Sequence, residues 1–370
     1  MGTKVSHDPA GRVVSLDALR GFDMFWIIGG EALFHALFEW IDTPWSSSLR
    51  RQLEHSQWNG FTFYDLIFPL FLFIVGAALP FAVSKRLQRG DHRGKLYLHI
   101  IRRAATLFLL GLIYNHILDL DFGSFRWAGV LQRIAVCYLI AGLVFMRFKI
   151  RGQAAIAGAI LLGYWLIMVL VPVPGYGAGV WTPQGNLAGY VDRLFLPGSF
   201  CCYRFGDNEG FLSTIPAVAT TLLGGLAGHL LRSTWEGGRK LQVLLGSGVA
   251  ALVAGLLWGL VFPINKLLWT SSYVLFAAGW SFLLLAFFYW VVDLRGHRKW
   301  AFPFVVIGLN PITIYVLQNV FDFGAVANIF VHGFIDDLGA LQPLFWVICV
   351  LAVKWLFLYF LYRQKIFLKA

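Results

Sequence analysis

Residues 61–84, FTFYDLIFPLFLFIVGAALPFAVS, form a continuous apolar stretch that carries a single charged side chain, Asp65. A transmembrane α-helix needs roughly 20 mainly apolar residues, so this stretch is long enough to cross a bilayer. The predicted spans of this kind run at about 21–40, 61–84, 98–118, 128–147, 153–172, 211–231, 241–262, 268–292, 300–320 and 341–362. The sequence therefore predicts an all-α, polytopic integral membrane protein of about ten transmembrane helices.

The composition supports the same class of protein. Of the 370 residues, 58% are hydrophobic, 17% are aromatic and only 13% are charged, and the mean hydropathy is +0.69. Soluble domains carry about 25% charged residues, so a soluble enzyme, a disordered tail and a disulfide-stapled secreted module are all disfavoured. The net charge of +11 does not indicate a nucleic-acid partner, because in so apolar a chain basic residues mark the cytoplasmic faces of a membrane protein.

The charges are distributed unevenly between the two sides of the predicted bundle. Ten spans place both termini on one side, and that side carries 22 of the 30 Lys and Arg residues, against 7 on the other side. Acidic residues lean the other way, with 6 on the side of the termini and 12 opposite. Since Lys and Arg accumulate in cytoplasmic loops, the N-terminus and the C-terminus are both predicted to be cytoplasmic.

We expect a single membrane domain over residues 1–370. The connection at 173–210 is rich in Gly, Pro and aromatic residues, which favours a folded extracytoplasmic loop over a disordered linker. Cys201 and Cys202 are adjacent in this loop, and a disulfide between sequence neighbours would be strained, so free thiols or bridges to another chain stay equally open. No cysteine spacing indicates zinc, and no metal is expected.

Ionisable groups at or within the bilayer are the first candidates for chemistry, because an uncompensated charge there is costly. His55, Trp58, Asn59 and Asp65 lie within eleven residues of one another, where the first outer loop enters the second span. An imidazole oriented by a carboxylate makes an effective general base, and a buried aspartate needs such a partner. The alternative is an interfacial histidine and a helix-packing aspartate. Glu31, near the middle of the first span, is a further functional candidate.

Three other polar residues have a functional and a structural interpretation. Gln132 and Arg133 begin the fourth span and are expected to face the bundle. Arg133 would pair there with a carboxylate, either Glu31 or Asp65, in a functional or a purely structural salt bridge. Asn310 in the ninth span is a substrate contact or an interhelical hydrogen-bonding residue.

Basic side chains gather on the predicted cytoplasmic face. The candidates among them are Arg20, Arg102, Arg103, Arg298 and Lys299. They determine topology and contact anionic membrane lipids, or they form an entrance for a phosphorylated ligand. The chain has no glycine-rich nucleotide-binding loop, which excludes an ATP-driven pump at the level of this chain.

Six sequence blocks together resemble the heparan-α-glucosaminide N-acetyltransferase family. They are SLDALRG, HSQWNGFTFYDLIFPLFLFIVG, GVLQRIAVCY, EGFLSTIPAVATTLLGGLAG, FPINKLLWTSSYVL and GLNPITIYVL, in the family's order, within a resemblance that extends from about residue 12 to residue 362. The chain resembles more closely the short bacterial, NagX-type members, which belong to the transmembrane acyltransferase superfamily. The resemblance implies a transmembrane acyltransferase domain in a bacterial inner (cytoplasmic) membrane, and a homodimer.

The same resemblance implies transfer of an acetyl group from cytoplasmic acetyl-CoA to the amine of a glucosamine-type sugar. The family's active-site histidine falls on His55 and its supporting aspartate on Asp65, and Glu31 is the third catalytic candidate. His55 either attacks the thioester or deprotonates the amine, with Asn59 as the expected oxyanion donor. Substrate binding is assigned to Trp58, Asn59, Gln132, Arg133 and Asn310, and acetyl-CoA binding to Arg20, Arg102, Arg103, Arg298 and Lys299.

A proton-coupled amino-sugar transporter is the competing class. Intramembrane carboxylates and Gly/Pro-interrupted helices suit such a carrier as well. Uptake of the sugar without an acetylated product would distinguish the carrier from the enzyme.

Overall fold

The computed structural model describes residues 13–367, and the chain divides into two compact units. The first unit contains the described residues up to His55, together with Thr62–Ile67 and the residues from Leu284 onward. The second unit contains Ser56–Phe61 and Phe68–Leu283. The segment around His55 is therefore where the chain passes repeatedly from one unit to the other.

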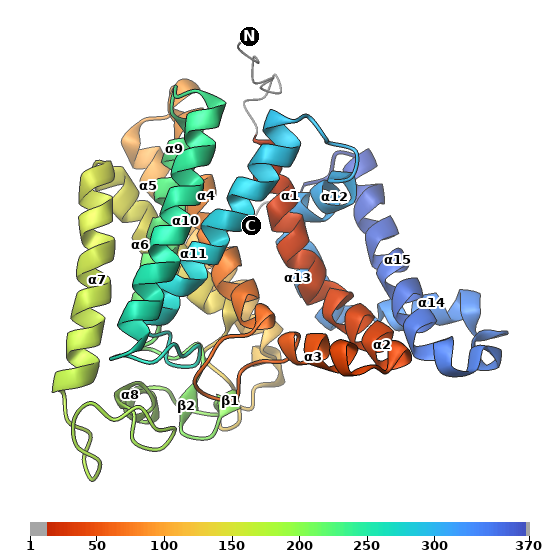
Figure 1. Ribbon diagram of the computed structural model, residues 1–370, viewed down its shortest axis with the longest axis horizontal. Coiled ribbons are helices and arrows are strands. Elements are labelled where there is room, and N and C mark those ends of the chain that lie inside the picture. The colour runs from red at the N-terminus through yellow and green to blue at the C-terminus, as the bar shows by residue number, and fades with distance from the viewer. Residues whose placement is uncertain (1–12, 368–370) are drawn as a thin grey trace. The chain divides into compact units, whose positions relative to one another are not determined.

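Apolar helices long enough to cross a bilayer make up most of each unit (Figure 1). Within residues 13–367, nine helical segments meet this description, and a bent pair of shorter helices makes up to ten. They are Val14–Ile41, Phe63–Gln88, Arg93–Tyr114, Val130–Arg147, Ile150–Leu170, Thr214–Arg232, Gly237–Gly259, Ser271–Leu294 and Ile335–Arg363, with the pair Phe302–Leu309 and Pro311–Val320. Each overlaps one predicted span, so the all-α polytopic membrane fold is confirmed.

The first unit is built from the two ends of the described chain. Its elements are α1 (Val14–Phe25), a π-helical turn (Trp26–Gly30), α2 (Glu31–Ile41), α3 (Pro44–Gln52), a 3-10 turn (Phe63–Leu66), a second π-helical turn (Tyr289–Leu294), α12 (Phe302–Leu309), α13 (Pro311–Val320), α14 (Phe323–Val331), a 3-10 segment (Ile335–Leu341) and α15 (Gln342–Arg363). The first span begins at Val14, earlier than predicted. The two charges near its start, Asp17 and Arg20, neutralise each other across one helical turn at 3.1 Å, which lets the helix include them.

Small residues let α1 and α12 pack closely. A Cβ atom on Gly21 would lie 1.7 Å from the carbonyl oxygen of Phe304, and one on Gly308 would lie 2.0 Å from the carbonyl oxygen of Asp17. Neither position has room for a side chain. Close approach through glycine is a common way for membrane helices to associate, because it increases van der Waals contact between the backbones.

The predicted ninth span differs from the single continuous helix expected at 300–320. Its two halves, α12 and α13, are bent by 71° where they meet. Pro311 explains the break, because a proline cannot donate a helical hydrogen bond and disfavours helical backbone at the residue before it. Asn310 accordingly has φ −132° and ψ 47°. Its buried side chain donates from Nδ2 to the carbonyl oxygen of Ile366 at 3.0 Å, a structural contact.

The second unit contains the central helices of the chain. Its elements are α4 (Ile67–Gln88), α5 (Arg93–Tyr114), a 3-10 turn (Ile117–Asp119), α6 (Val130–Arg147), α7 (Ile150–Leu170), α8 (Leu187–Phe195), β1 (Cys202–Tyr203), β2 (Gly206–Asp207), α9 (Thr214–Arg232), α10 (Gly237–Gly259) and most of α11 (Ser271–Phe288). Helices α4 and α9 pack as closely as α1 and α12 do. A Cβ on Gly76 would lie 1.8 Å from the oxygen of Thr221, and one on Gly224 would lie 1.9 Å from the oxygen of Phe73.

The 173–210 segment has secondary structure and buried residues of its own. It contains α8 and a two-stranded antiparallel hairpin, in which Cys202 pairs with Asp207. Val173 and Leu187 from this segment are buried in a cluster with Tyr164, Phe262 and other apolar side chains of the second unit. The extracytoplasmic location of the segment stays a prediction.

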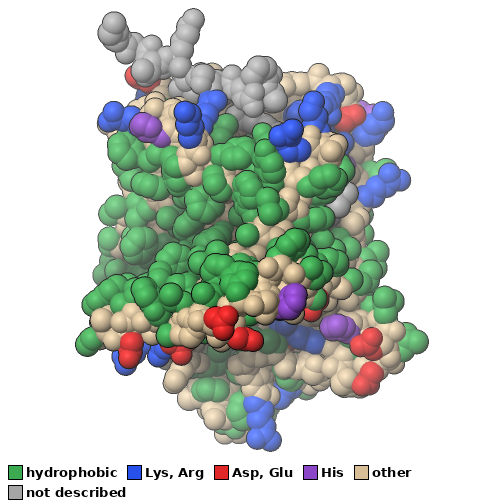
Figure 2. Space-filling model, turned by 90° about the vertical axis from the view of Figure 1, so that its right-hand side faces the viewer, with side chains coloured by type: hydrophobic (Ala, Val, Ile, Leu, Met, Phe, Trp, Pro, Cys, Tyr) green, Lys and Arg blue, Asp and Glu red, His purple; other side chains and the backbone are tan. Residues whose placement is uncertain are grey.

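The surface in Figure 2 carries a broad band of hydrophobic side chains. On the face shown, Lys and Arg side chains line the edge above this band and also occur below it, whereas most of the visible Asp and Glu side chains lie below it. Many large apolar side chains are exposed, including Leu109, Leu257 and Leu356, as expected where lipid rather than water surrounds the helices. The separation of charge matches the predicted arrangement, and the assignment of the basic side to the cytoplasm rests on the positive-inside rule.

Candidate functional site

His55 and Asp65 meet within the first unit. Nδ1 of His55 lies 2.9 Å from Oδ1 of Asp65. The Asp65 side chain is fully buried, whereas 53% of the His55 side chain is exposed. The expected pairing of an imidazole with a buried carboxylate is present in the structure, and its catalytic role stays a prediction.

The local sequence explains how this pair is held. Asp65 belongs to the 3-10 turn that starts α4, and the backbone N–H of Thr62 donates to its Oδ2 at 3.1 Å. Oγ1 of Thr62 in turn donates to the carbonyl oxygen of Glu54 at 2.6 Å. The backbone N–H of Phe63 donates to Oε1 of Gln52 at 3.2 Å. These bonds tie the residues that precede His55 to the turn that carries Asp65.

The carboxylate also determines which nitrogen of the imidazole can react. Because Asp65 accepts a hydrogen bond, neutral His55 carries its proton on Nδ1 and its lone pair on Nε2. Nε2 is then the atom able to take a proton from a substrate or to attack a carbonyl carbon. The half-exposed imidazole is accessible for either step.

Tyr64 and Glu31 extend this cluster. The Tyr64 ring centroid lies 4.9 Å from that of His55, and its hydroxyl lies within hydrogen-bonding reach of Glu31. Glu31 is the first residue of α2, and its Oε1 lies 3.6 Å from Nε2 of His35. Tyr64 and His35 were not among the predicted site residues. Their proximity depends on the fold, although Tyr64 directly precedes Asp65 in the sequence.

Asp23 is a third residue of this region that was not among the predicted site residues. It is fully buried in α1, and neither of its carboxylate oxygens has a hydrogen-bond partner among residues 13–367. It lies within electrostatic reach of Tyr64. An isolated buried charge costs several kcal/mol, so this carboxyl needs a proton or a cation.

Trp58 and Asn59 belong to the second unit, where they make specific contacts. Nε1 of Trp58 donates to the carbonyl oxygen of Trp181 at 2.7 Å, and its ring packs edge-on against Tyr203 at 5.3 Å. Oδ1 of Asn59 accepts a hydrogen bond from Nδ2 of Asn265 at 3.0 Å. These contacts fasten the segment after His55 to the second unit, and a role in substrate binding stays a prediction.

Arg133, expected to pair with a carboxylate of the first or second span, is buried within the second unit. Its guanidinium donates to the hydroxyl of Ser213 and, from Nε, to Oγ1 of Thr214 at 3.3 Å. It also lies over the Trp269 ring, 4.7 Å from the centroid. Gln132, next to it in α6, donates from Nε2 to a backbone carbonyl at 3.4 Å. Two hydroxyls, the carbonyl oxygen of Gly210 and an aromatic ring therefore surround the Arg133 guanidinium, whose Nη1 has no hydrogen-bond partner among residues 13–367.

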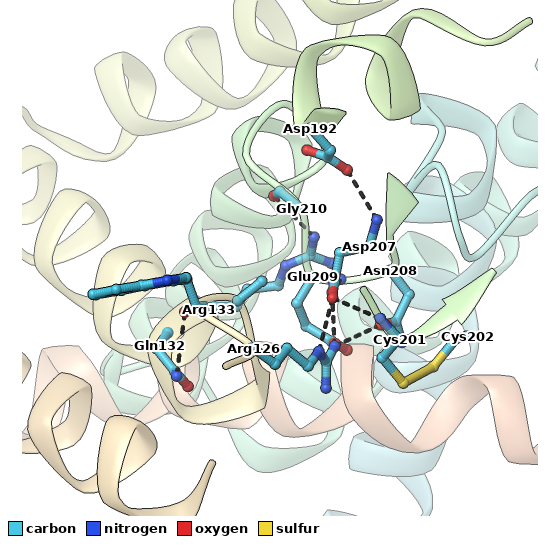
Figure 3. Close-up of polar contacts among 12 residues, drawn as sticks. Arg126, Gln132, Arg133, Asp192, Cys201, Cys202, Asp207, Asn208, Glu209 and Gly210 are labelled. Atoms are coloured by element: carbon cyan, nitrogen blue, oxygen red, sulfur yellow. Dashed lines mark hydrogen bonds and ion pairs between the residues drawn. A yellow bond between two sulfur atoms is a disulfide. The ribbon is translucent and has the colours of Figure 1, made fainter. Parts of the chain in front are cut away.

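The largest ion-pair network of the second unit was not predicted from sequence (Figure 3). The Arg126 guanidinium donates from Nε and Nη2 to the two carboxylate oxygens of Asp207, at 2.7 Å each. It also contacts Glu209 and Oδ1 of Asn208. Both carboxylates are almost completely buried. Burial alone would lower the pKa of Arg126, but the hydrogen bonds to Asp207 and the charge of Glu209 outweigh it and raise this pKa.

Asp192 on α8 joins the same region. Its Oδ2 accepts the backbone N–H of Asp207 at 3.1 Å, and its Oδ1 accepts that of Phe211 at 2.8 Å. Burial raises the pKa of Asp192 to about 6, although the two backbone N–H groups oppose this shift. This carboxyl therefore titrates close to neutral pH.

The basic candidates for acetyl-CoA binding are divided between the units. Arg102 and Arg103 lie on α5 of the second unit, with Arg102 exposed and Arg103 lying over the Tyr138 ring at 4.8 Å. Arg298 and Lys299 are exposed in the first unit. The first unit also holds Arg20, which is paired with Asp17 and donates to the carbonyl oxygen of Gly308 at 3.3 Å.

Cys201 and Cys202 are joined to each other by a disulfide, which resolves the alternatives left open by the sequence (Figure 3). The backbone N–H of Cys201 donates to Oδ2 of Asp207 at 2.9 Å. Cys137 and Cys349 are free thiols. In the described part of the chain, no group of three or more His, Cys, Asp or Glu side chains is arranged to hold a metal ion.

Comparison with known proteins agrees with the sequence motifs. The family described as "Domain of unknown function (DUF5009)" matches residues 12–182. Heparan-alpha-glucosaminide N-acetyltransferase of Homo sapiens is 30% identical over 376 residues, which cover 85% of this chain and 55% of the human protein. The Mus musculus protein of the same name is 30% identical over 377 residues, covering 85% and 56%. The chain spans about half the length of these curated relatives, and over most of its own length it resembles heparan-α-glucosaminide N-acetyltransferase.

Proposed function

We propose that this protein is a transmembrane N-acetyltransferase that transfers an acetyl group from acetyl-CoA to the amine of a glucosamine-type sugar. The observation that carries the proposal is the contact of His55 with the buried carboxylate of Asp65 at 2.9 Å. The similarity to proteins named as N-acetyltransferases supports it. We place the protein in a bacterial cytoplasmic membrane, with acetyl-CoA supplied from the cytoplasm.

The His55–Asp65 pair supports two routes for the transfer. In one, Nε2 of His55 takes a proton from the sugar ammonium, and the free amine attacks the thioester carbonyl to form the amide and release the CoA thiol. In the other, Nε2 attacks the thioester first, releases the thiol and carries the acetyl group until the amine displaces it. Either route releases one proton overall. Asp65 stabilises the positively charged imidazole in both.

The groups around His55 favour a cationic acceptor. Glu31 and Asp23 contribute carboxyl groups within reach of Tyr64, and Asp23 has no hydrogen-bond partner among the described residues. A sugar ammonium would offset this negative character, and we keep Glu31 as the third catalytic candidate beside His55 and Asp65. For the polyanionic cofactor, we propose phosphate contacts within each unit separately: Arg298 and Lys299, both exposed, with Arg20 in the first unit, and the exposed Arg102 with Arg103 in the second.

The decisive experiment compares His55→Ala with a matched control. His116 is an exposed histidine of the second unit that faces Asp119, so His116→Ala removes the same side chain outside the proposed site. We expect His55→Ala to lower acetyl transfer to glucosamine at least 10²- to 10⁴-fold and His116→Ala to leave it unchanged. Retained turnover in purified, folded His55→Ala protein contradicts the proposal. Labelled acetyl-CoA without acceptor separates the routes, since only an acetyl carrier retains label on His55.

A proton-coupled amino-sugar transporter is the alternative function. The 71° bend between α12 and α13 is the observation that favours it, because discontinuous helices form the binding sites of many carriers. Protein in liposomes, supplied with glucosamine and internal acetyl-CoA, distinguishes the two functions. Accumulation of unmodified sugar supports the transporter, whereas N-acetylglucosamine as the product supports the enzyme.

A further inference from the structure

Lys354 is a lysine within the last transmembrane span of the first unit. It lies twelve residues after the start of α15, about 18 Å along the helix axis. Ionisable side chains at such depth are costly and usually have a function. Nζ of Lys354 donates to the carbonyl oxygen of Ile28 at 2.6 Å and to Oε1 of Gln318 at 3.2 Å.

Both of these acceptors are neutral. The carbonyl of Ile28 lies in the π-helical turn Trp26–Gly30, where the left-handed φ of 141° at Gly29 interrupts the helical backbone and exposes carbonyl groups. Within residues 13–367, no carboxylate lies within ion-pair distance of the Lys354 ammonium. The positive charge therefore lacks a counter-ion.

A pocket of about 330 Å³ opens beside this ammonium. It lies where the chain breaks between α13 and α14, and its lining includes Gln318, Asn319, Val320, Phe321, Asp322 and Lys354. Irregular backbone at membrane depth is tolerated where it lines a polar cavity, and this pocket provides one. It is a site distinct from the His55–Asp65 pair and has no part in the function proposed above.

Besides the ammonium of Lys354, the pocket offers further hydrogen-bond donors. Because Oε1 of Gln318 accepts from Lys354, its Nε2 group is oriented to donate elsewhere. The N-terminal end of α14 also faces this break, and its partial positive charge favours an anion. Asp322 lines the pocket as well, but its Oδ1 already accepts the backbone N–H of Ala325 at 3.0 Å.

The pocket opens to the surface beside exposed apolar side chains. Val320 and Phe321 in its lining are 76% and 45% exposed. A lysine side chain on a helix points toward the N-terminal end of that helix, so the Lys354 ammonium extends toward the membrane boundary at the start of α15. We propose that this pocket binds the phosphate group of an anionic phospholipid, with Lys354 as counter-ion and Gln318 as second donor.

Binding is measured with the full chain purified in detergent and in nanodiscs. The readout is thermal unfolding, with phosphatidylglycerol or zwitterionic phosphatidylcholine as the nanodisc lipid, and with inorganic phosphate added in detergent. We expect stabilisation by phosphatidylglycerol relative to phosphatidylcholine. If inorganic phosphate also stabilises the protein in detergent, the phosphate group alone is sufficient for binding. If inorganic phosphate has no effect, the ligand is the intact lipid. Equal stability in both lipids overturns the proposal.

Two variants test the named residues. Lys354→Gln should weaken phosphatidylglycerol binding about tenfold or more, as loss of a charge-assisted hydrogen bond does. Lys365→Gln, which removes an exposed lysine from the same unit, should leave it unchanged. If Lys354→Gln does not fold, Gln318→Glu serves instead, since it gives the ammonium an internal counter-ion and repels phosphate. Unchanged lipid preference in the folded variant overturns the proposal.

Discussion

The carboxylate of Asp65 binds His55 and the backbone N–H of Thr62 at the same time, one through each oxygen. The same group thus orients the imidazole and begins the helix that follows. Asp65→Asn keeps the shape but replaces one acceptor by a donor, which favours the wrong tautomer of His55. We expect turnover to fall about 10²- to 10⁴-fold with little change in the KM for acetyl-CoA. Steady-state kinetics in detergent measures both quantities.

The control for this substitution is Asp119→Asn, because the Asp119 side chain is 70% exposed. It should leave both kinetic constants unchanged. If Asp65→Asn retained full turnover, the imidazole would not depend on its carboxylate, and the assignment of the pair as catalytic would fail.

Removal of Arg126 should destabilise the second unit strongly. Arg126→Ala leaves Asp207 and Glu209 as buried carboxylates without their cation, which typically costs about 3–5 kcal/mol. Arg126→Lys keeps the positive charge but loses the bidentate hydrogen bonding to Asp207, so we expect a smaller loss of stability than for Arg126→Ala. Arg204→Ala, at an exposed arginine, should change stability by no more than about 0.5 kcal/mol. Thermal unfolding in detergent provides the comparison, and equal unfolding temperatures for Arg126→Ala and Arg204→Ala would contradict it.

Asp192 predicts a dependence of stability on pH. Its pKa is about 6 in the folded protein because of burial, against 3.8 ordinarily, so the folded state binds the proton more tightly than the unfolded state. Protonated Asp192 therefore stabilises the folded state fully below about pH 4. As the pH rises to about 6, the free energy of unfolding falls by roughly 3 kcal/mol. Unfolding temperatures measured between pH 4 and pH 7 should show this slope. Asp192→Asn should flatten it, whereas Asp119→Asn should not.

Two Gly→Ala substitutions, one at the contact of α4 with α9 and one on an open face of α10, should have opposite effects on stability. Gly224→Ala places a Cβ against the backbone of Phe73, so we expect a loss of about 1–3 kcal/mol from overpacking. Gly246 lies in α10 with no other atom within 4 Å of a Cβ, and Gly246→Ala should stabilise the helix by about 0.5–1 kcal/mol. Similar unfolding temperatures for Gly224→Ala and Gly246→Ala would contradict this prediction, because they would show that α4 and α9 can move apart without loss of stability.

The membrane fold was predictable because hydrophobicity alone identifies spans of this length. Each predicted span has a counterpart in the structure. The break in the ninth span was not predicted, although Asn310 followed by Pro311 carries a local signal for it. The π-helical turn before Glu31 was not predicted either, although Gly29 and Gly30 carry a local signal for it, since the φ of 141° at Gly29 suits glycine alone.

The site was predictable where its residues are close in sequence. His55 and Asp65 are ten residues apart, so chain connectivity already limits their separation. The partners of Arg126 lie 81 to 83 residues away, and nothing local to Arg126 indicates which acidic residues it will meet. Arg133 was expected to need a carboxylate because it is charged. Its guanidinium instead contacts the Ser213 hydroxyl and the Trp269 ring, and it lies within electrostatic reach of Glu209, far from it in sequence.

The pairing of Cys201 with Cys202 has a practical consequence for assembly and labelling. While that disulfide is intact, neither sulfur is available to link two copies of the chain, so a homodimer would have to associate through noncovalent surfaces. Of the four cysteines, only Cys137 and Cys349 remain as thiols, and Cys137 is fully buried. A maleimide reagent applied to the folded, oxidised protein should therefore attach at Cys349 alone, which offers a native position for a fluorescent or spin probe on α15.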